Sequence, residues 1–130
     1  MLFALNSKAE ENNIKYYSED SGILSLMYHR FDENKYPSTN IQMDIFKEQI
    51  SIINTLNFKF YDPQRLQKKF YIPKNKKEIL ITIDDAFLSF YKIAWPYLKK
   101  EKIPFILFVS TEAIGKTGYM SWQQIQEIEK

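Results

Sequence analysis

The sequence predicts an α/β fold, in which a parallel sheet carries helices on its faces and is either open or rolled into a barrel. Short apolar runs of strand length alternate with segments whose apolar residues recur every three or four positions. The run 78–83 is apolar without alternation, as is typical of a strand that is buried on both faces. In folds of this class, ligands bind where the carboxyl ends of the strands meet.

Four strands are expected, each a short apolar run bounded by polar or turn-forming residues. They cover residues 23–29, 58–61, 78–83 and 103–110. The fourth strand, like the third, is expected to be buried.

Two helices are expected between the first three strands. Thr39 and Gln42 have the spacing of a capping box and open a helix over 40–55. A shorter helix over 63–69 takes Asp62 as its N-cap.

Two further helices are expected in the second half of the chain. Apolar residues from Phe87 to Leu98 fall on one helix face, and Pro96 should kink that helix because it lacks a backbone N–H. The final helix is capped by Ser121, with Gln124 in the box position, and no stop signal follows it. The chain is therefore expected to be cut from a longer protein rather than finished at this helix.

The composition favours one globular domain. The chain has 130 residues, a formal net charge of +2 and a 45% hydrophobic share. No apolar run approaches the roughly 20 residues that a membrane span needs. The basic run "KNKK" at 74–77 is typical of a solvated turn, so no nucleic-acid partner is expected.

Residues 1–21 are interpreted as a lead-in segment, and residues 22–130 as the domain. The opening "MLFALNSKAEE" contains Ser7 and Ala9 in the small-x-small pattern of a signal cleavage site, but it lacks a basic start and a full apolar region. Two interpretations stay open, a remnant of a signal peptide and a frayed terminus.

The absence of cysteine excludes disulfides, zinc-thiolate sites and cysteine nucleophiles. His29 is the single histidine, so the chain cannot complete a site that needs two. By default, a lone histidine at a strand end is a hydrogen-bonded core residue.

Asp84 and Asp85 stand side by side at the end of the third predicted strand. Adjacent carboxylates repel each other unless a cation, a shared proton or solvent relieves the repulsion, so the pair favours a metal or proton-transfer site. His29 and Ser110 end other strands and are expected at the same edge. Two alternatives remain for the pair, a phospho-acceptor site and a cap of the following helix.

Two other motifs are weaker. The stretch "STEAIGKTG" has serine where a phosphate-binding loop needs its first glycine, and Glu112 would place a carboxylate against the phosphates, so nucleotide binding is not expected. Trp95 and Trp122 are most simply core or rim residues, although Trp122 is placed where it can stack on a sugar ring.

Three stretches, in this order, resemble a known family: "LMYHRF", "ITIDDAFLSFYKIAWPYLKKEKIPFILFVST" and "YMSWQQIQEI". They are similar to the N-terminal half of polysaccharide deacetylases, the NodB-homology domains of carbohydrate esterase family four. The similarity covers about residues 23–130. It implies an α/β fold that is a partial (β/α) barrel of the polysaccharide deacetylase type, truncated before closure.

The resemblance also implies an activity. Members of the family hydrolyse N-acetyl or O-acetyl groups of a polysaccharide with a divalent metal, usually zinc, that one aspartate and two histidines hold. The motif "TIDDA" matches the family's aspartate pair, so Asp84 would be the catalytic base and Asp85 a metal ligand. Ala86 stands where the family has glycine, and its Cβ restricts the φ and ψ angles that the backbone can adopt at this position. The histidine pair is missing from the chain, which alone is expected to be inactive.

His29 and Arg30 are expected at the rim of the active site, because the first strand of a parallel barrel ends on the same face as the third. The expected partner is an acetylated polysaccharide or oligosaccharide, and the parent enzyme is expected to be exported. The alternative is a non-catalytic carbohydrate-binding or interaction domain that keeps the fold.

Overall fold

The structure is a computed structural model that describes residues 21–68 and 77–129. Apart from Ser21, the predicted lead-in segment and its signal-peptide interpretation lie outside the described residues. The same holds for most of the basic run 74–77. No helix within the described ranges is long and apolar enough to cross a membrane.

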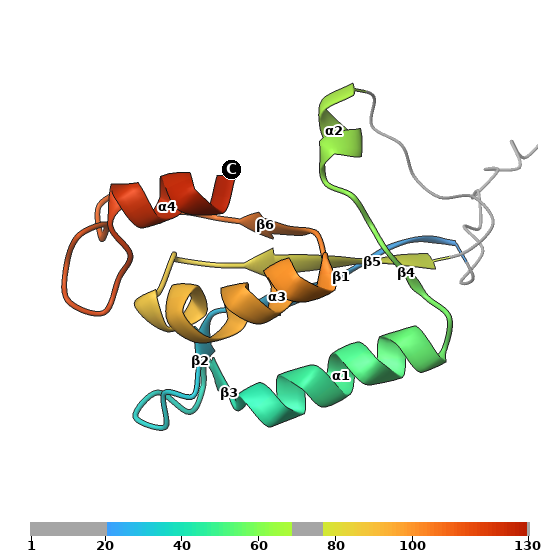
Figure 1. Ribbon diagram of the computed structural model, residues 1–130, viewed down its shortest axis with the longest axis horizontal. Coiled ribbons are helices and arrows are strands. Elements are labelled where there is room, and N and C mark those ends of the chain that lie inside the picture. Colours follow the sequence, from blue (N-terminus) through green and yellow to red (C-terminus); the bar gives the residue numbers. More distant parts are fainter. Residues whose placement is uncertain (1–20, 69–76, 130) are drawn as a thin grey trace, which may run out of the picture.

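A parallel sheet forms the centre of the fold (Figure 1). Strand β1 (Gly22–Tyr28) pairs along its whole length with β5 (Lys77–Ile83). On the other side of β5, β4 (Lys59–Phe60) pairs with its first half and β6 (Phe105–Leu107) with its last residues. All three pairings are parallel, which confirms the predicted fold class.

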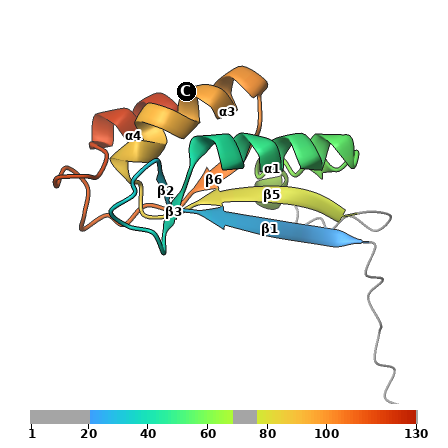
Figure 2. The same ribbon diagram turned by 90° about the horizontal axis from the view of Figure 1, so that it is seen from below.

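The longer helices lie on one side of this sheet (Figure 2). Helix α1 (Met43–Thr55) lies between β1 and β4 in the chain, and α2 (Gln64–Lys68) follows β4. After β5 come a π-helical turn, η1 (Phe90–Ala94), and α3 (Trp95–Glu101). Helix α4 (Trp122–Glu129) follows β6.

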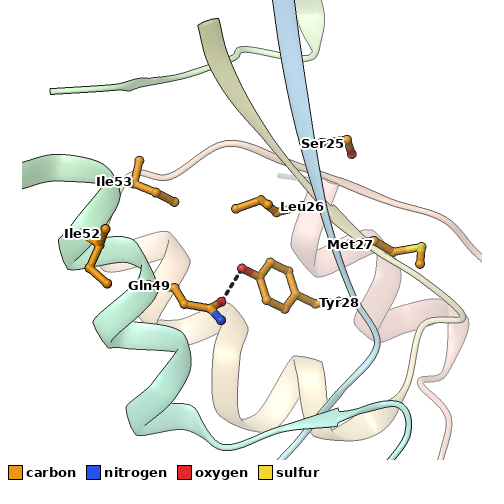
Figure 3. Close-up of a pocket in the computed structure, with 7 residues that line it drawn as sticks. All are labelled: Ser25, Leu26, Met27, Tyr28, Gln49, Ile52 and Ile53. Atoms are coloured by element: carbon orange, nitrogen blue, oxygen red, sulfur yellow. Dashed lines mark hydrogen bonds between the residues drawn. The ribbon is translucent and has the colours of Figure 1, made fainter. Parts of the chain in front are cut away.

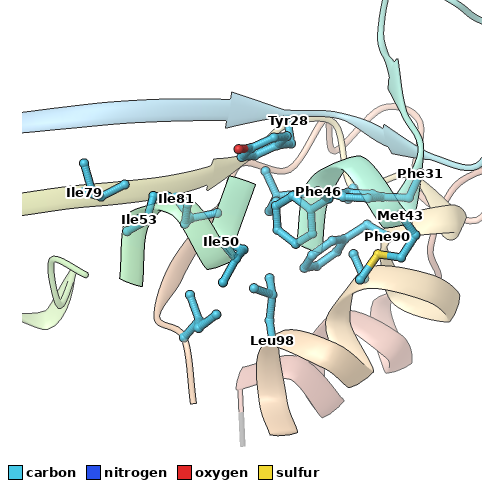
Figure 4. Close-up of a cluster of buried hydrophobic side chains, with 14 of the residues drawn as sticks. Tyr28, Phe31, Met43, Phe46, Ile50, Ile53, Ile79, Ile81, Phe90 and Leu98 are labelled. Atoms are coloured by element: carbon cyan, nitrogen blue, oxygen red, sulfur yellow. The ribbon is translucent and has the colours of Figure 1, made fainter. Parts of the chain in front are cut away.

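The core lies between the sheet and helices α1 and α3 (Figure 4). Its largest fully buried side chains include Phe46, Phe90 and Leu98, which pack with Ile81 of β5. Phe46 also meets the ring of Tyr28 edge-on, with centroids 4.8 Å apart. Burying an aliphatic or aromatic side chain of this size contributes roughly 1.5–3 kcal/mol, so this layer supplies most of the driving force that holds the helices on the sheet.

Two of the predicted caps are confirmed. The Gln64 N–H donates to Asp62 Oδ1 at 2.9 Å at the start of α2. At the start of α4, the Gln124 N–H donates to Ser121 Oγ at 3.2 Å and the Ser121 N–H donates to Gln124 Oε1 at 2.9 Å. The second pair is a complete capping box.

The predicted capping box at the start of α1 is wrong. Gln42 makes no side-chain cap, and α1 begins at Met43, whose N–H donates to Asp32 Oδ1 at 2.7 Å. The residues before α1 instead form β3 (Asn40–Ile41), a short parallel pair with β2 (Arg30–Phe31). Two-residue strands carry no periodic signal, so the sequence pattern could not reveal them.

The fourth strand is shorter and less buried than expected. Strand β6 covers Phe105–Leu107 rather than 103–110, and its side chains are only half-buried. Phe108, directly after it, is 54% exposed. Among the described residues β6 pairs only with β5, so its other edge is not covered by a neighbouring strand.

Pro96 disturbs its helix as expected, but without a simple kink. The preceding residues form the π-helical turn η1, and the Trp95 N–H bonds to the Phe90 carbonyl five residues back. Pro96 then stands at the start of α3, where its missing N–H costs nothing.

Candidate active site

The aspartate pair leaves the sheet at the carboxyl end of β5. The Asp84 N–H donates to the Tyr28 carbonyl at 2.8 Å, which continues the β1–β5 ladder by one bond. Because Tyr28 pairs with Ile83, the residues that follow them, His29 and Asp84, lie side by side. His29 Nε2 and Asp84 Oδ2 are 4.0 Å apart, and both side chains are about a quarter exposed, at 23% and 27%.

Ser110 reaches the same place from β6. The Phe108 N–H donates to the Ile83 carbonyl at 2.8 Å, which carries the chain beyond β6 along the end of β5. Ser110 Oγ then donates to Asp85 Oδ1 at 2.7 Å. The ends of three parallel strands thus gather one histidine, two carboxylates and one hydroxyl.

The backbone at the pair is strained. Asp85 and Ala86 have φ angles of 67° and 54°, in the left-handed region where a residue with a Cβ pays roughly 1–2 kcal/mol. The buried Ala86 is held there by its carbonyl, which accepts from the Met120 N–H at 2.9 Å. Strain of this kind collects at functional sites, and Ala86 stands where the resembling family has glycine.

Asp84 Oδ1 is buried and has no hydrogen-bond partner among the described residues. A buried acceptor without a partner costs free energy, so it marks a place where a ligand or a proton is expected. Neither Asp84 nor Asp85 accepts a hydrogen bond from a helix N-terminus within the described ranges. The interpretation of the pair as a helix cap is therefore not supported.

These donors match part of a metal site. Carboxylate oxygens suit a divalent cation, and the partnerless Oδ1 of Asp84 together with the single hydrogen bond on Asp85 leaves oxygen atoms available. Within residues 21–68 and 77–129, however, no group of three or more histidine, cysteine, aspartate or glutamate side chains is arranged so that it could hold a metal ion by itself. The described residues fit a metal as contributors of one or two ligands.

Arg30 lies beside the pair, but its guanidinium is already engaged. Its central carbon is 3.5 Å from the ring centroid of Phe87 and 4.0 Å from that of Tyr36. Arg30 Nη1 also donates to Glu33 Oε2 at 2.9 Å, and the arginine side chain is only 12% exposed. The sequence pattern placed Arg30 at the rim but did not predict its aromatic partners. The apolar spacing had assigned Phe87 to the buried face of a helix.

Two open pockets flank this end of the sheet. One, of about 490 Å³, is bordered by Ser110 and by Glu112, Lys116 and Tyr119 of the following loop. The other, of about 430 Å³, is bordered by His29. Neither lining includes Asp84 or Asp85, so each pocket reaches the site only through Ser110 or His29.

A third pocket lies away from this site, between β1 and α1 (Figure 3). Leu26, Ile52 and Ile53 give it a mainly apolar wall, and Tyr28 Oη donates to Gln49 Oε1 at 2.7 Å across it. Its lining contains no acidic or basic side chain. It therefore offers no groups for acid–base or metal chemistry.

A parallel α/β sheet with a carboxylate pair at its carboxyl end is the arrangement that the resemblance to polysaccharide deacetylases leads us to expect. Comparison with known proteins agrees. The profile of the polysaccharide deacetylase family matches residues 71–130. Poly-beta-1,6-N-acetyl-D-glucosamine N-deacetylase of Staphylococcus epidermidis is 27% identical over 146 residues, which cover 95% of this chain and 50% of that protein.

Solved structures show the same relationship. IcaB from Ammonifex degensii superposes with a TM-score of 0.72 at 33% identity, covering 84% of this chain and 48% of that one. A de-N-acetylase from Aggregatibacter actinomycetemcomitans shares the fold, with a TM-score of 0.70 at 15% identity over 82% of this chain and 50% of that one. The chain is thus similar to polysaccharide deacetylases in sequence and in fold, and it spans about half the length of these relatives.

Proposed function

We propose that this chain is the N-terminal part of a longer enzyme, here called the parent protein, that removes acetyl groups from a polysaccharide. The observation that carries the proposal is the gathering of Asp84, Asp85, His29 and Ser110 at the end of three parallel strands. The name of the staphylococcal relative supports an N-acetylated sugar polymer as substrate. Because that polymer is a polysaccharide, we also propose that the parent protein is exported.

We assign different roles to the two aspartates. Asp85 would be one ligand of a divalent metal, with zinc as the first candidate. A bound divalent cation polarises a carbonyl and makes a water molecule more acidic. The remaining ligands would come from residues of the parent protein outside this chain, since the described ranges do not complete the set.

Asp84 would act as the general base. Its buried Oδ1 has no other hydrogen-bond partner in the described part of the chain and is free to accept a proton. The attacking water would give that proton to Asp84 and its oxygen to the acetyl carbon, and the bond from the acetyl carbon to the sugar nitrogen would break. Asp84 would then pass this proton on to the departing sugar nitrogen, so the products are acetate and a free amine and the carboxylate is restored.

His29 would stand at the rim of this site. Its Nε2 lies 4.0 Å from Asp84 Oδ2, beyond a good hydrogen bond but close enough to influence that carboxylate. Arg30 would support the site from behind, through its contacts with Phe87 and Tyr36.

The test is acetate release from partly acetylated poly-β-1,6-glucosamine oligosaccharides by the parent protein, with and without a chelator. We expect release that the chelator stops and that added zinc restores. The alternative, a non-catalytic carbohydrate-binding domain, predicts oligosaccharide binding without acetate release at any metal concentration. That result would overturn the proposal.

A further inference from the structure

Ser110 makes the one direct hydrogen bond that Asp85 receives from another side chain in the described part of the chain. The donor Ser110 Oγ lies 2.7 Å from Asp85 Oδ1, and the two residues are 25 positions apart in the sequence. Ser110 is partly buried, and together with its neighbours in the following loop it lines the 490 Å³ pocket.

The bond is not needed to hold the two strands together. The backbone bond from the Phe108 N–H to the Ile83 carbonyl, at 2.8 Å, already joins the end of β6 to β5. The turn that follows is closed by its own backbone bond, from the Ala113 N–H to the Ser110 carbonyl at 2.9 Å. The Ser110 hydroxyl therefore acts on the Asp85 carboxylate rather than on the path of the chain.

The carboxylate has a particular need for such a partner. Asp85 has a φ of 67° and follows the last residue of the β1–β5 ladder, so the pleat of the strand does not set the direction of its side chain. With Oδ1 engaged by Ser110, the direction of Oδ2 is settled by the geometry of the carboxylate. A fixed carboxylate binds a cation without first losing side-chain entropy.

We propose that Ser110 is a positioning residue for Asp85: its hydroxyl holds Oδ1 and so presents Oδ2 to a divalent cation. The inference rests on the proposed function, because it takes Asp85 as the metal ligand. Removing an outer hydrogen-bond partner of a metal ligand typically weakens metal affinity about 10- to 100-fold.

The experiment compares Ser110→Ala, Ser110→Thr and the matched control Ser51→Ala, an exposed serine of α1, in the parent protein. Zinc affinity is measured by competition with a chromophoric chelator, and thermal unfolding is measured on the metal-free protein. We expect Ser110→Ala to weaken zinc binding about 10- to 100-fold, with metal-free unfolding unchanged. Ser110→Thr, which keeps the hydroxyl, and Ser51→Ala should bind zinc as the unmodified protein does.

A second variant covers the case in which alanine disturbs folding. Ser110→Cys keeps the size of the side chain and replaces the hydroxyl by a weak donor, and we expect the same loss of affinity with normal metal-free unfolding. Loss of metal-free stability in both variants, in proportion to the loss of affinity, would show a structural role and overturn the inference. So would unchanged zinc affinity in Ser110→Ala.

Asp85→Ala separates this inference from the proposed function. If Asp85→Ala abolishes zinc binding while Ser110→Ala leaves it intact, the metal assignment stands and the positioning role is wrong. If Asp85→Ala binds zinc normally, the metal assignment fails, and the inference about Ser110 fails with it. At saturating zinc, Ser110→Ala should regain most of its kcat, which Asp85→Ala should not.

Discussion

The guanidinium carbon of Arg30 lies 3.5 Å from the ring centroid of Phe87, two residues beyond the aspartate pair. The same guanidinium carbon lies 4.0 Å from the ring centroid of Tyr36, in the loop between β2 and β3. Arg30 thus joins the loop after the first strand to the turn that carries Asp85. The ion pair with Glu33 at 2.9 Å keeps the guanidinium in this orientation.

We expect Arg30→Met to lower the free energy of unfolding of the parent protein by about 2 kcal/mol, because two partly desolvated cation–π contacts and an ion pair are lost together. Arg30→Lys should recover part of the loss, since lysine keeps the charge but not the planar stacking. The control is Lys35→Met, whose Nζ lies 5.7 Å from the Tyr36 ring on an exposed loop. Denaturant unfolding measures all three, and equal effects of Arg30→Met and Lys35→Met would contradict this account.

The roles of the two aspartates should separate by mutation in the parent protein. Asp84→Asn should keep zinc and lose turnover by about 10²–10⁴-fold, because an amide cannot accept the proton of water. Asp85→Ala should weaken zinc binding directly. Zinc titration and acetate release, measured on the same preparations, would refute the assignment if Asp84→Asn lost the metal or kept full activity.

His29→Ala tests the rim position of the histidine. Its Nε2 is 4.0 Å from Asp84 Oδ2, so we expect lower deacetylation with normal thermal unfolding. Unchanged kinetics would return His29 to the role of an ordinary strand-end residue.

Tyr28 should make the stability of the protein depend on pH in the alkaline range. Burial raises the pKa of Tyr28 from 10.0 to about 12, because the charged phenolate loses water in the fold. The folded state therefore binds this proton more tightly than the unfolded state. The stabilisation that this proton on Tyr28 contributes is complete below pH 10 and is lost as the pH rises toward about 12.

Tyr28→Phe tests this dependence. The variant loses the hydrogen bond to Gln49, so we expect it to be less stable at neutral pH by about 1 kcal/mol. Between pH 10 and 12 its urea midpoint should fall less steeply than that of the unmodified protein. Parallel slopes across that range would exclude Tyr28 as the cause.

The isolated 130-residue chain should be marginally stable or prone to associate. Within the described residues, β1 and β6 each pair on one edge only, and Leu24, Met27 and Phe108 beside those edges are 48%, 61% and 54% exposed. Open edges with exposed apolar side chains favour pairing between chains. A sharp, reversible thermal transition of a monomer, verified by analytical ultracentrifugation, would contradict this expectation.

The sequence by itself determined the parallel α/β fold, because the alternating order of strands and helices can be predicted from the spacing of apolar residues within each segment. Short apolar runs without alternation are typical of strands in a sheet covered by helices, and the pattern predicted the central strand within one residue of its observed bounds at Lys77 and Ile83. The caps at Asp62 and Ser121 were equally predictable, since donor and acceptor lie within three residues of each other.

Only the tertiary structure decided which groups act on the aspartate pair. The hydroxyl of Ser110 comes from 25 residues away and Arg30 meets Phe87 from another strand, and no local pattern encodes either distance. The same holds for Asp32, which accepts the Met43 N–H at the start of α1 from 11 positions earlier, in place of the expected capping box. Periodicity reports which face of an element is buried, whereas side-chain partners depend on strand register and on backbone turns such as the left-handed pair Asp85–Ala86, which arise only when the sheet assembles.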